Sequence, residues 1–338
     1  MKNKMRVGFN PFKDEPQKDS EFIHQIIIPV YIPNQEGYFK DSFAILKLCL
    51  ESLWSTVHKK TFITIVNNGS DIIVKEYLDF LLKQNKIQEL IHTDNIGKLN
   101  AILKGLAGNN IELVTISDSD VLFLPNWQSE TIKVFTNIPN AGVVGIVPQF
   151  KMYEQNCGNV IWDNLFSKKL RFIPVKNKEA LIRFYDSLGW DRNYNQDYLE
   201  YNLGLEISSD LKVLIGSGHF VATYKKDIFD EIVSYIGFKM GGTSEGYLDK
   251  SPLKKNYWRL TTQDNYACHL GNTLEDWMSV LQVSPIETVQ YGFHKNIKLN
   301  PVLYFIKNRV FVKFISVKWM KKIFLRYKKL PQSMIRNY

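Results

Sequence analysis

The sequence is poor in the features that define several large classes of protein. Its three cysteines, Cys49, Cys157 and Cys268, show no C-x-x-C spacing, so we expect buried thiols rather than a disulfide framework or a zinc knuckle. No apolar run approaches the ~18 to 20 residues that cross a bilayer. Residues 1–22 carry mixed charges and no apolar core, so we expect no secretory signal peptide there. The 338 residues therefore predict a globular cytoplasmic protein.

Acidic residues are absent from Thr288 to Tyr338, whereas Lys and Arg number twelve there. The whole chain has a formal net charge of +9, so the remainder, with 31 basic and 34 acidic residues, has a charge of −3. Large apolar residues recur at steps of three and four in this tail, as on one side of a helix. They are Leu303, Ile306, Val310, Phe314, Val317, Met320, Phe324 and Tyr327.

Basic amphipathic helices lie on anionic bilayers, where each cation contributes on the order of 1 kcal/mol. We therefore expect residues 301–338 to bind an anionic membrane, with the protein peripheral on the inner face of that membrane, and we expect no nucleic-acid partner. Two alternatives are a helix packed on its own domain with a solvated basic face, and a strand formed by the β-branched residues of this segment.

Short β-branched runs alternate with helical apolar spacing through the first third of the chain. The predicted strands are Ile26–Tyr31, Phe62–Val66, Leu90–His92 and Leu113–Ile116, and the predicted helices are Asp41–Ser55, Ile72–Lys83 and Lys98–Leu106. This alternation predicts an α/β fold with a doubly wound, mostly parallel sheet that binds ligands beyond the carboxyl ends of its strands. Residues 148–211 are predicted to be irregular and substrate-facing, followed by a strand at Val213–Ala222 and a helix at Lys226–Tyr235.

The sequence Ser117-Asp118-Ser119-Asp120 directly follows the fourth predicted strand. Two carboxylates at a strand end can converge on one Mg²⁺ or Mn²⁺ ion, which can bridge them to a diphosphate. On its own an Asp-x-Asp is also a common turn or helix cap.

Two upstream segments can likewise be either ordinary turns or caps, or parts of a ligand-binding site. Asn67-Asn68-Gly69-Ser70 forms a turn whose Asn side chains can bind the edge of a nucleotide base. Asp94 to Ala101 offers a flexible glycine, a helix N-terminus and Lys98, all of which favour a phosphate.

Together these motifs resemble, in order and spacing, family-2 glycosyltransferases with the GT-A fold, over roughly Ile26 to Asn272. The matching segments are Ile27 to Tyr31, Asn67 to Ser70, Asn95 to Ala101 and Asp118 to Asp120. The resemblance implies that a nucleoside diphosphate sugar binds at Pro29, Tyr31, Asn67, Asn68, Asn95, Lys98, Asn100, Asp118 and Ser119. It further implies that Asp118 and Asp120 hold Mn²⁺ or Mg²⁺, with a UDP-sugar favoured over a GDP-sugar. Asn67 and Asn68 stand where the family commonly has Asp.

In the second half, His269 in His269-Leu270-Gly271 resembles the family's late histidine. The resemblance implies that His269 completes the metal shell. Counting back from it places Glu245 at the family's catalytic carboxylate, with Asp249 and Asp264 as alternatives. His294 is the alternative metal ligand. Gly216 to Phe220 matches the family's small-residue strand that enters the active site, which implies that His219 could touch the sugar or the acceptor.

These expectations describe an inverting glycosyltransferase that acts on a hydroxyl of a glycan or lipid-linked acceptor, as in surface polysaccharide assembly. Its expected regions are a leader at 1–22, a nucleotide-sugar and metal region at 23–235, an acceptor and catalytic-base region at 236–300, and the basic tail. A sugar-phosphate nucleotidyltransferase is the nearest alternative, although Val30 to Asn34 lacks its glycine-rich phosphate loop. A non-catalytic nucleotide-sugar-binding module on the membrane is the other.

Overall fold

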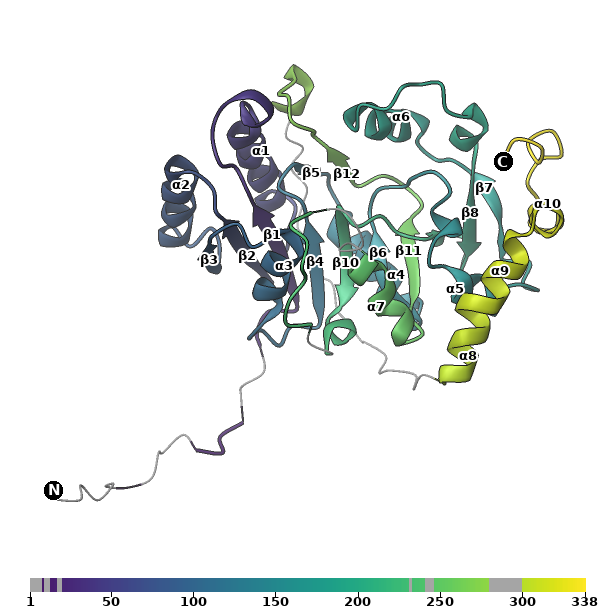
Figure 1. Ribbon diagram of the computed structural model, residues 1–338, viewed down its shortest axis with the longest axis horizontal. Helices are drawn as coiled ribbons and strands as arrows, with labels where there is room; N and C mark the ends of the chain where they lie inside the picture. The colour runs from purple at the N-terminus through teal and green to yellow at the C-terminus, as the bar shows by residue number, and fades with distance from the viewer. Residues whose placement is uncertain (1–7, 9–12, 17–19, 231–232, 241–245, 280–299) are drawn as a thin grey trace.

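The computed structural model describes residues 8, 13–16, 20–230, 233–240, 246–279 and 300–338. A ten-stranded sheet with the order β3-β2-β1-β4-β10-β6-β11-β9-β8-β7 runs through the molecule (Figure 1). Its strands are β1 (His24–Val30), β2 (Thr61–Asn68), β3 (Glu89–Thr93), β4 (Leu113–Ser117), β6 (Ala141–Gly145), β7 (Leu170–Pro174), β8 (Tyr201–Glu206), β9 (Lys212–Ile215), β10 (Val221–Lys225) and β11 (Trp258–Thr262). A small antiparallel pair joins β5 (Val121–Phe123) to β12 (Ala267–His269).

Seven of these ten strands run in one direction, and only β10, β9 and β7 run against them. The first four strands are parallel neighbours, so their carboxyl ends meet at one edge. The predicted α/β class and mostly parallel sheet are therefore confirmed.

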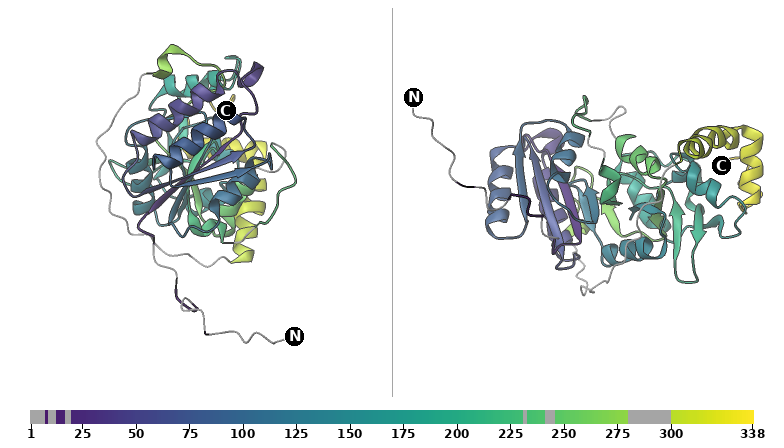
Figure 2. Two further views of the ribbon diagram at one scale, coloured as in Figure 1. Left: turned by 90° about the vertical axis from the view of Figure 1, so that its left-hand side faces the viewer. Right: turned by 90° about the horizontal axis from the view of Figure 1, so that it is seen from below.

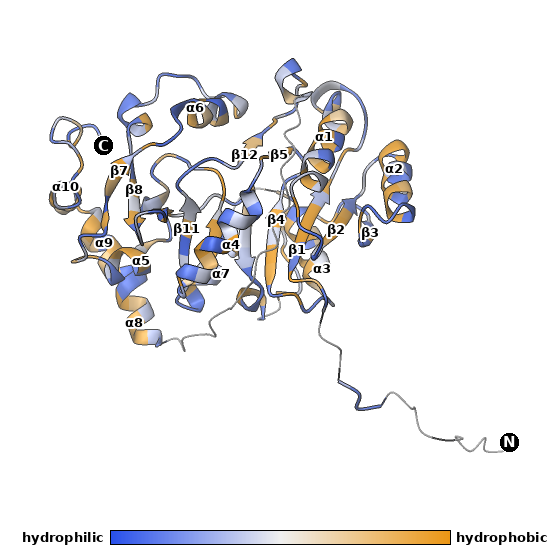
Figure 3. Cartoon of the chain, turned by 180° about the vertical axis from the view of Figure 1, so that it is seen from behind, coloured by the Kyte–Doolittle hydropathy of each residue, from blue (hydrophilic) through white to orange (hydrophobic). Residues whose placement is uncertain are grey.

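Helices pack on both faces of the sheet. They are α1 (Ser42–Trp54), α2 (Ile72–Lys83), α3 (Lys98–Leu106), α4 (Trp127–Asn137), α5 (Gly158–Asp163), α6 (Lys178–Ser187), α7 (Gly246–Lys254), α8 (Pro301–Phe305), α9 (Phe311–Ser316) and α10 (Lys318–Tyr327). Alternate residues of β1 point to opposite faces, as the pleat requires. Ile26 and Ile28 pack with α1 and α2, whereas Ile27 packs with α3. Figure 3 shows hydrophobic residues concentrated on β1, β2 and β4.

Three segments differ from the sequence prediction. Residues 148–211 are not irregular but contain α5, β7, α6 and β8. The strand expected at 213–222 is two strands, β9 and β10, because Gly216 has a φ of +100° that ends β9. In place of the helix expected at 226–235, the described residues form only a short 3-10 turn at Lys226–Phe229.

The C-terminal helices lie at the opposite end of the long axis from β1, β2 and β3 (Figures 1 and 2). A π-helical turn at Ile306–Val310 connects α8 to α9, and an extended Val317 separates α9 from α10. Phe311, Phe324 and Leu325 are buried against the body of the protein. The Lys307 ammonium also pairs with Asp163 at 2.5 Å, which fixes the π-helical turn to the end of α5. Among the described residues, no helix has the length and apolarity needed to span a membrane.

Candidate active site

A pocket of about 460 Å³ opens at the carboxyl edge of the parallel strands. It lies where ligands bind in open α/β sheets. Eight residues of the predicted site line it, namely Pro29, Tyr31, Asn68, Asn95, Lys98, Asp118, Ser119 and Asp120. The pocket thus brings together residues that lie at or just after the ends of β1, β2, β3 and β4 and are far apart in the sequence.

Asp118 and Asp120 stand on the connection from β4 to β5. The Asp118 amide donates to the Phe220 carbonyl at 2.8 Å, and the Asp120 carbonyl accepts from the Leu270 amide at 2.8 Å. Both backbone bonds hold the connection against neighbouring segments, so the two carboxylates are presented from a fixed backbone. The Lys98 ammonium lies 2.5 Å from Asp118 Oδ1.

Asp120 has an unusual environment for a carboxylate. Its side chain is 30% exposed, yet its Oδ1 atom is buried and has no hydrogen-bond partner among the described residues. Burial, followed by the nearby Asp118 carboxylate, raises the pKa of Asp120 to about 6. An unpaired buried carboxylate oxygen is costly, and a bound cation would satisfy it.

His269 faces this carboxylate from β12. The Ser187 hydroxyl donates to the Phe184 carbonyl at 2.6 Å, so it accepts from His269 Nδ1, which lies 2.9 Å away. In neutral His269 the Nε2 atom therefore carries a lone pair, and it lies 3.5 Å from Asp120 Oδ2. Two electron-rich atoms facing each other suit a cation between them, and a hydrogen bond at the far imidazole nitrogen is the usual way of orienting a metal-binding histidine.

The set of metal-binding groups is nevertheless incomplete. Among the described residues, no three side chains of His, Cys, Asp or Glu converge closely enough to hold a metal ion. The Asp118 carboxylate is occupied by its contact with Lys98. Asp120 and His269 fit a divalent cation as they stand, and Asp118 fits once its carboxylate leaves the ammonium.

Three backbone amides at the start of α3 donate hydrogen bonds to other groups of the protein. The N–H groups of Ile96, Gly97 and Lys98 donate to Asn68 Oδ1, Asn95 Oδ1 and the Lys239 carbonyl, at 2.9, 3.1 and 2.9 Å. These three amides are therefore used within the protein, whereas the Lys98 side chain lines the pocket.

Gly97 permits a close approach of chain 236–240 to α3. Its φ is +89°, and a Cβ atom there would lie 2.8 Å from the Lys239 Cα. Asn100 completes the docking, since its amide exchanges hydrogen bonds with the backbone of Ile236 at 2.8 and 2.9 Å. The structure thus places Asn100 beneath this segment, outside the residues that line the pocket.

Asn67 is also outside the pocket lining. Its side chain accepts from the Ser70 amide and contacts His92 Nδ1, and the residue is 3% exposed. Of the two asparagines in this turn, Asn68 lines the pocket. A role for Asn67 would be to shape the turn.

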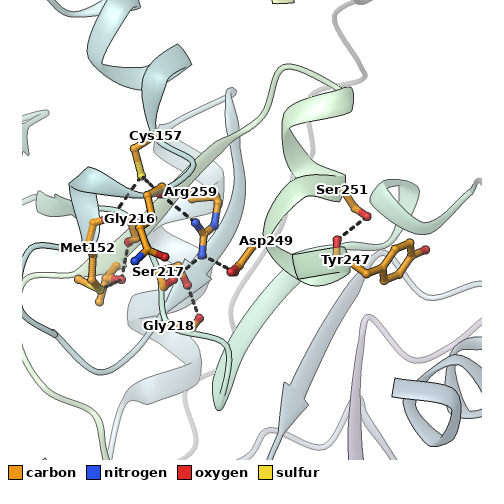
Figure 4. A network of polar contacts seen from close by, with 11 residues as sticks. Met152, Cys157, Gly216, Ser217, Gly218, Tyr247, Asp249, Ser251 and Arg259 are labelled. Carbon is orange, nitrogen blue, oxygen red and sulfur yellow. Dashed lines mark hydrogen bonds and ion pairs between the residues drawn. The ribbon is translucent and has the colours of Figure 1, made fainter. Parts of the chain in front are cut away.

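The structure describes two of the three carboxylates considered for the catalytic base. Glu245 lies outside the described residues, as does the alternative metal ligand His294. Asp249, on the first turn of α7, accepts from Arg259 Nη2 at 2.5 Å (Figure 4). Asp264 pairs with Lys176 at 3.0 Å. Neither alternative lines the pocket, and each already has a cationic partner.

The Arg259 guanidinium holds several segments together. It also donates to the Ser217 carbonyl at 2.6 Å (Figure 4) and to the Gln155 carbonyl at 3.1 Å. Ser217 belongs to the loop from Gly216 to Phe220, which contains His219 and joins β9 to β10. Because the Phe220 carbonyl accepts from Asp118, Arg259 supports the loop that borders the Asp-x-Asp connection.

Several pocket residues were missed by the sequence analysis. Lys239 and Met240 enter from the segment docked on α3, and Tyr38 and Phe39 enter from a 3-10 turn at Gly37–Phe39. Ser187, which orients His269, lies 82 residues before it. The aromatic pair Tyr38-Phe39 is the only local sequence feature that could have suggested any of them.

The acidic connection lies at the edge of a parallel sheet, beside a pocket with a cation and aromatic rings, which is where α/β proteins of this topology bind ligands. The family model of glycosyl transferase family 2 matches residues 26–198. The chain therefore belongs to glycosyl transferase family 2, and the resemblance drawn from its motifs is confirmed.

The chain is also similar in fold to three solved structures. S. aureus TarS 1-349 has 13% identity and a TM-score of 0.41 over 73% of this chain and 60% of that chain. The mannosyltransferase PcManGT from Pyrobaculum calidifontis, in complex with GDP-Man and Mn²⁺, has 14% identity and a TM-score of 0.44 over 76% and 61%. GalNAc-T7 with UDP, GalNAc and Mn²⁺ has 11% identity and a TM-score of 0.48 over 73% and 44%. The chain thus spans less than two thirds of these three proteins. No curated protein matches it.

Proposed function

We propose that this protein is a metal-dependent inverting glycosyltransferase. It moves a sugar from a nucleoside diphosphate donor, with UDP-sugars favoured over GDP-sugars, to a hydroxyl of a glycan or lipid-linked acceptor. The observation that carries the proposal is Asp120, whose buried Oδ1 has no hydrogen-bond partner among the described residues and whose Oδ2 lies 3.5 Å from His269 Nε2. Asp120 lines a pocket that Lys98 also lines. This arrangement suits a divalent cation and the diphosphate that it would neutralise.

Each side chain has a distinct task in this proposal. Asp118, Asp120 and His269 would hold Mn²⁺ or Mg²⁺, which as a Lewis acid stabilises charge on the leaving diphosphate. Lys98 adds a positive charge at the same end of the pocket. Tyr31, 39% exposed at the end of β1, offers a face on which the nucleotide base can stack.

Glu245 remains the proposed base, since both alternatives have cationic partners. A base within hydrogen-bond reach removes the proton from the acceptor hydroxyl while its oxygen attacks the anomeric carbon. The bond from that carbon to the diphosphate breaks in the same displacement, with inversion. Because Glu245 follows from the family resemblance, its test is Glu245→Gln, for which we expect loss of transfer and retained UDP binding.

Turnover tests this proposal. UDP- and GDP-sugars are incubated with the protein and Mn²⁺, Mg²⁺ or EDTA, and release of the nucleoside diphosphate is measured. We expect release with one donor, dependent on the metal and lost in Asp120→Ala. Asp191→Ala, at an exposed carboxylate, is the matched control and should keep full activity.

Two other outcomes would replace the proposal. Pyrophosphate release from a nucleoside triphosphate and a sugar phosphate would identify a nucleotidyltransferase. Donor binding without turnover, under every metal condition and with a range of glycan and lipid acceptors, would identify a binding module.

We further propose that the C-terminal helices hold the enzyme on an anionic membrane, at the inner face of the cell membrane. Most of the predicted apolar stripe faces solvent, because Leu303, Val310, Phe314, Val317 and Tyr327 are 40 to 54% exposed, whereas Phe324 is buried. Further exposed rings belong to Phe305 and Trp319, at 58 and 60%. The exposed cations among them include Arg309, Lys313, Lys318, Lys322, Arg326 and Lys329.

Aromatic and aliphatic side chains interspersed with cations, in a segment without acidic residues, complement an anionic bilayer surface. The measurement is co-sedimentation with phosphatidylcholine vesicles that contain or lack 30% phosphatidylserine. Phe314→Ser/Trp319→Ser should reduce binding to the anionic vesicles at least about tenfold, since each ring inserts apolar area. The matched control, Phe80→Ser, removes a 55% exposed ring from α2 at the other end of the molecule and should bind normally. Equal binding to neutral vesicles, or preference for DNA over anionic vesicles as salt is raised, would contradict membrane docking.

A further inference from the structure

The closest charged contact in the pocket joins two residues that the proposed function assigns to different ligands. Lys98 Nζ, from the first residue of α3, lies 2.5 Å from Asp118 Oδ1, which follows β4. The two side chains are 17% and 23% exposed, and both line the pocket. The ammonium thus lies on the carboxylate proposed to bind the metal.

This contact balances charge within the acidic connection. Asp118 and Asp120 are close enough for one carboxylate to raise the pKa of the other, and Lys98 opposes that effect. A divalent cation bound by both carboxylates would be repelled by an ammonium that stayed at Asp118. Metal binding at Asp118 therefore requires the ammonium to move.

The same pocket provides a destination for the ammonium. A nucleoside diphosphate brings negative charge to the metal, and the three backbone N–H groups at the start of α3 already have partners within the protein. The Lys98 side chain is flexible and its ammonium is a strong phosphate partner. Its backbone is fixed by the bond to the Lys239 carbonyl, so the exchange involves the side chain alone.

We propose that Lys98 exchanges its partner from the Asp118 carboxylate to the diphosphate of the nucleotide, so that metal and nucleotide bind cooperatively. In this mechanism Lys98 weakens metal binding to the nucleotide-free protein and strengthens nucleotide binding once the metal is present. The inference rests on the proposed function, because it assigns an order of loading to the same site. Its consequence is that the cation enters with the diphosphate rather than ahead of it.

The experiment measures Mn²⁺ binding by electron paramagnetic resonance, with and without UDP and with and without GDP, and therefore does not depend on turnover. Lys98→Gln should bind Mn²⁺ alone at least about fivefold more tightly than the unaltered protein, because the competing charge is gone. It should bind the nucleotide at least about tenfold more weakly in the presence of Mn²⁺, because a charge-assisted phosphate contact is lost. The factor by which nucleotide tightens Mn²⁺ binding should shrink accordingly.

Lys239→Gln is the matched control. It removes the same charge from the lining of the same pocket, but the structure gives Lys239 no ion pair with Asp118 among the described contacts. Mn²⁺ affinity in Lys239→Gln should stay within about twofold of the unaltered protein, since a solvated charge is strongly screened. Lys98→Arg should restore weak Mn²⁺ binding, because it keeps the positive charge.

Three results would overturn the exchange. They are unchanged or weaker Mn²⁺ binding in Lys98→Gln, an equal gain in Lys239→Gln, and nucleotide affinity that Lys98→Gln leaves intact. Thermal unfolding of each variant establishes that it is folded, and Lys98→Met serves as a second charge-removing variant if Lys98→Gln is not. If the unaltered protein binds no Mn²⁺ with either nucleotide, the sugar-transfer proposal fails as well. If Mn²⁺-dependent turnover persists while Lys98→Gln leaves Mn²⁺ affinity unchanged, the exchange alone fails.

Discussion

The ion pair between Asp249 and Arg259 gives a prediction that separates a structural carboxylate from a catalytic one. The Arg259 side chain is 4% exposed, and Asp249 is 16% exposed. Asp249→Asn would leave a buried guanidinium with the carbonyls of Ser217 and Gln155 as its remaining acceptors. Removing one partner of a buried pair costs about 3 to 5 kcal/mol, and because Asn keeps an acceptor oxygen we expect about 3 kcal/mol.

Urea unfolding followed by circular dichroism measures this loss. Asp264→Asn is the matched control, because the Lys176 side chain of that pair is 53% exposed and the expected loss is below about 1 kcal/mol. If Asp249→Asn does not fold, Asp249→Leu/Arg259→Met should recover most of the stability, since an apolar pair often replaces a buried ion pair without loss. A variant that loses less than about 1 kcal/mol yet abolishes sugar transfer would refute the structural role and make Asp249 the base.

Three further predictions concern stability and the attachment of the tail. Burial, then the charge of His58, lowers the pKa of His24 to about 3. The unfolded chain therefore binds this proton first as pH falls from 7.5 to 5.5. His24 should lower the unfolding free energy by about 1.4 kcal/mol over that range, measured as the difference between the unaltered protein and His24→Gln; an identical pH dependence of the two proteins would contradict this. Lys328→Met removes an ammonium that donates to three carbonyls after α5. Chemical denaturation should show that the free energy of unfolding falls by about 1.5 to 3 kcal/mol. Lys329→Met, at an exposed position, should leave that free energy almost unchanged. A Cβ atom at Gly158, in α5, would lie 2.5 Å from Val312 Cγ2 in α9. Gly158→Val should therefore push α9 away from α5 and speed hydrogen exchange in α9. Unchanged exchange in α9 would show that α5 and α9 can separate without cost.

The first half of the fold follows from local sequence patterns. The bounds predicted for α2 and α3 are those of the structure, and the Asp71 side chain accepts from the Val74 amide at the start of α2. Strands β1 to β4 are β-branched runs between helices, so both the elements and their parallel order can be predicted. The Asp-x-Asp then lies at the pocket because it follows β4.

The remaining features depend on contacts that local patterns do not encode. The expected strand at 213–222 breaks at Gly216, where a Cβ atom would lie 2.5 Å from Met152, a residue far away in the sequence. Asn67 and Asn100 look like ligand-binding residues in the sequence, yet both bind neighbouring backbone. Lys239 reaches the pocket only because its segment docks on Gly97, so no motif of its own marks it.

The same distinction applies to the tail. Its apolar period predicts a helix, and the structure has helices there. The period does not tell which side of the helix is buried, because the packing of Phe311 and Phe324 depends on α5 and β7 in the body. The large exposed residues at other positions are therefore a result of the structure rather than of the sequence pattern.

The central claim, a divalent cation held at Asp120 and His269 beside a nucleoside diphosphate, is tested most directly by anomalous diffraction from crystals grown with Mn²⁺ and the preferred nucleotide. We predict a manganese peak within about 2.5 Å of an Asp120 carboxylate oxygen and of His269 Nε2. A fully occupied nucleotide with no manganese peak at these atoms, or with the manganese bound elsewhere, would contradict the account.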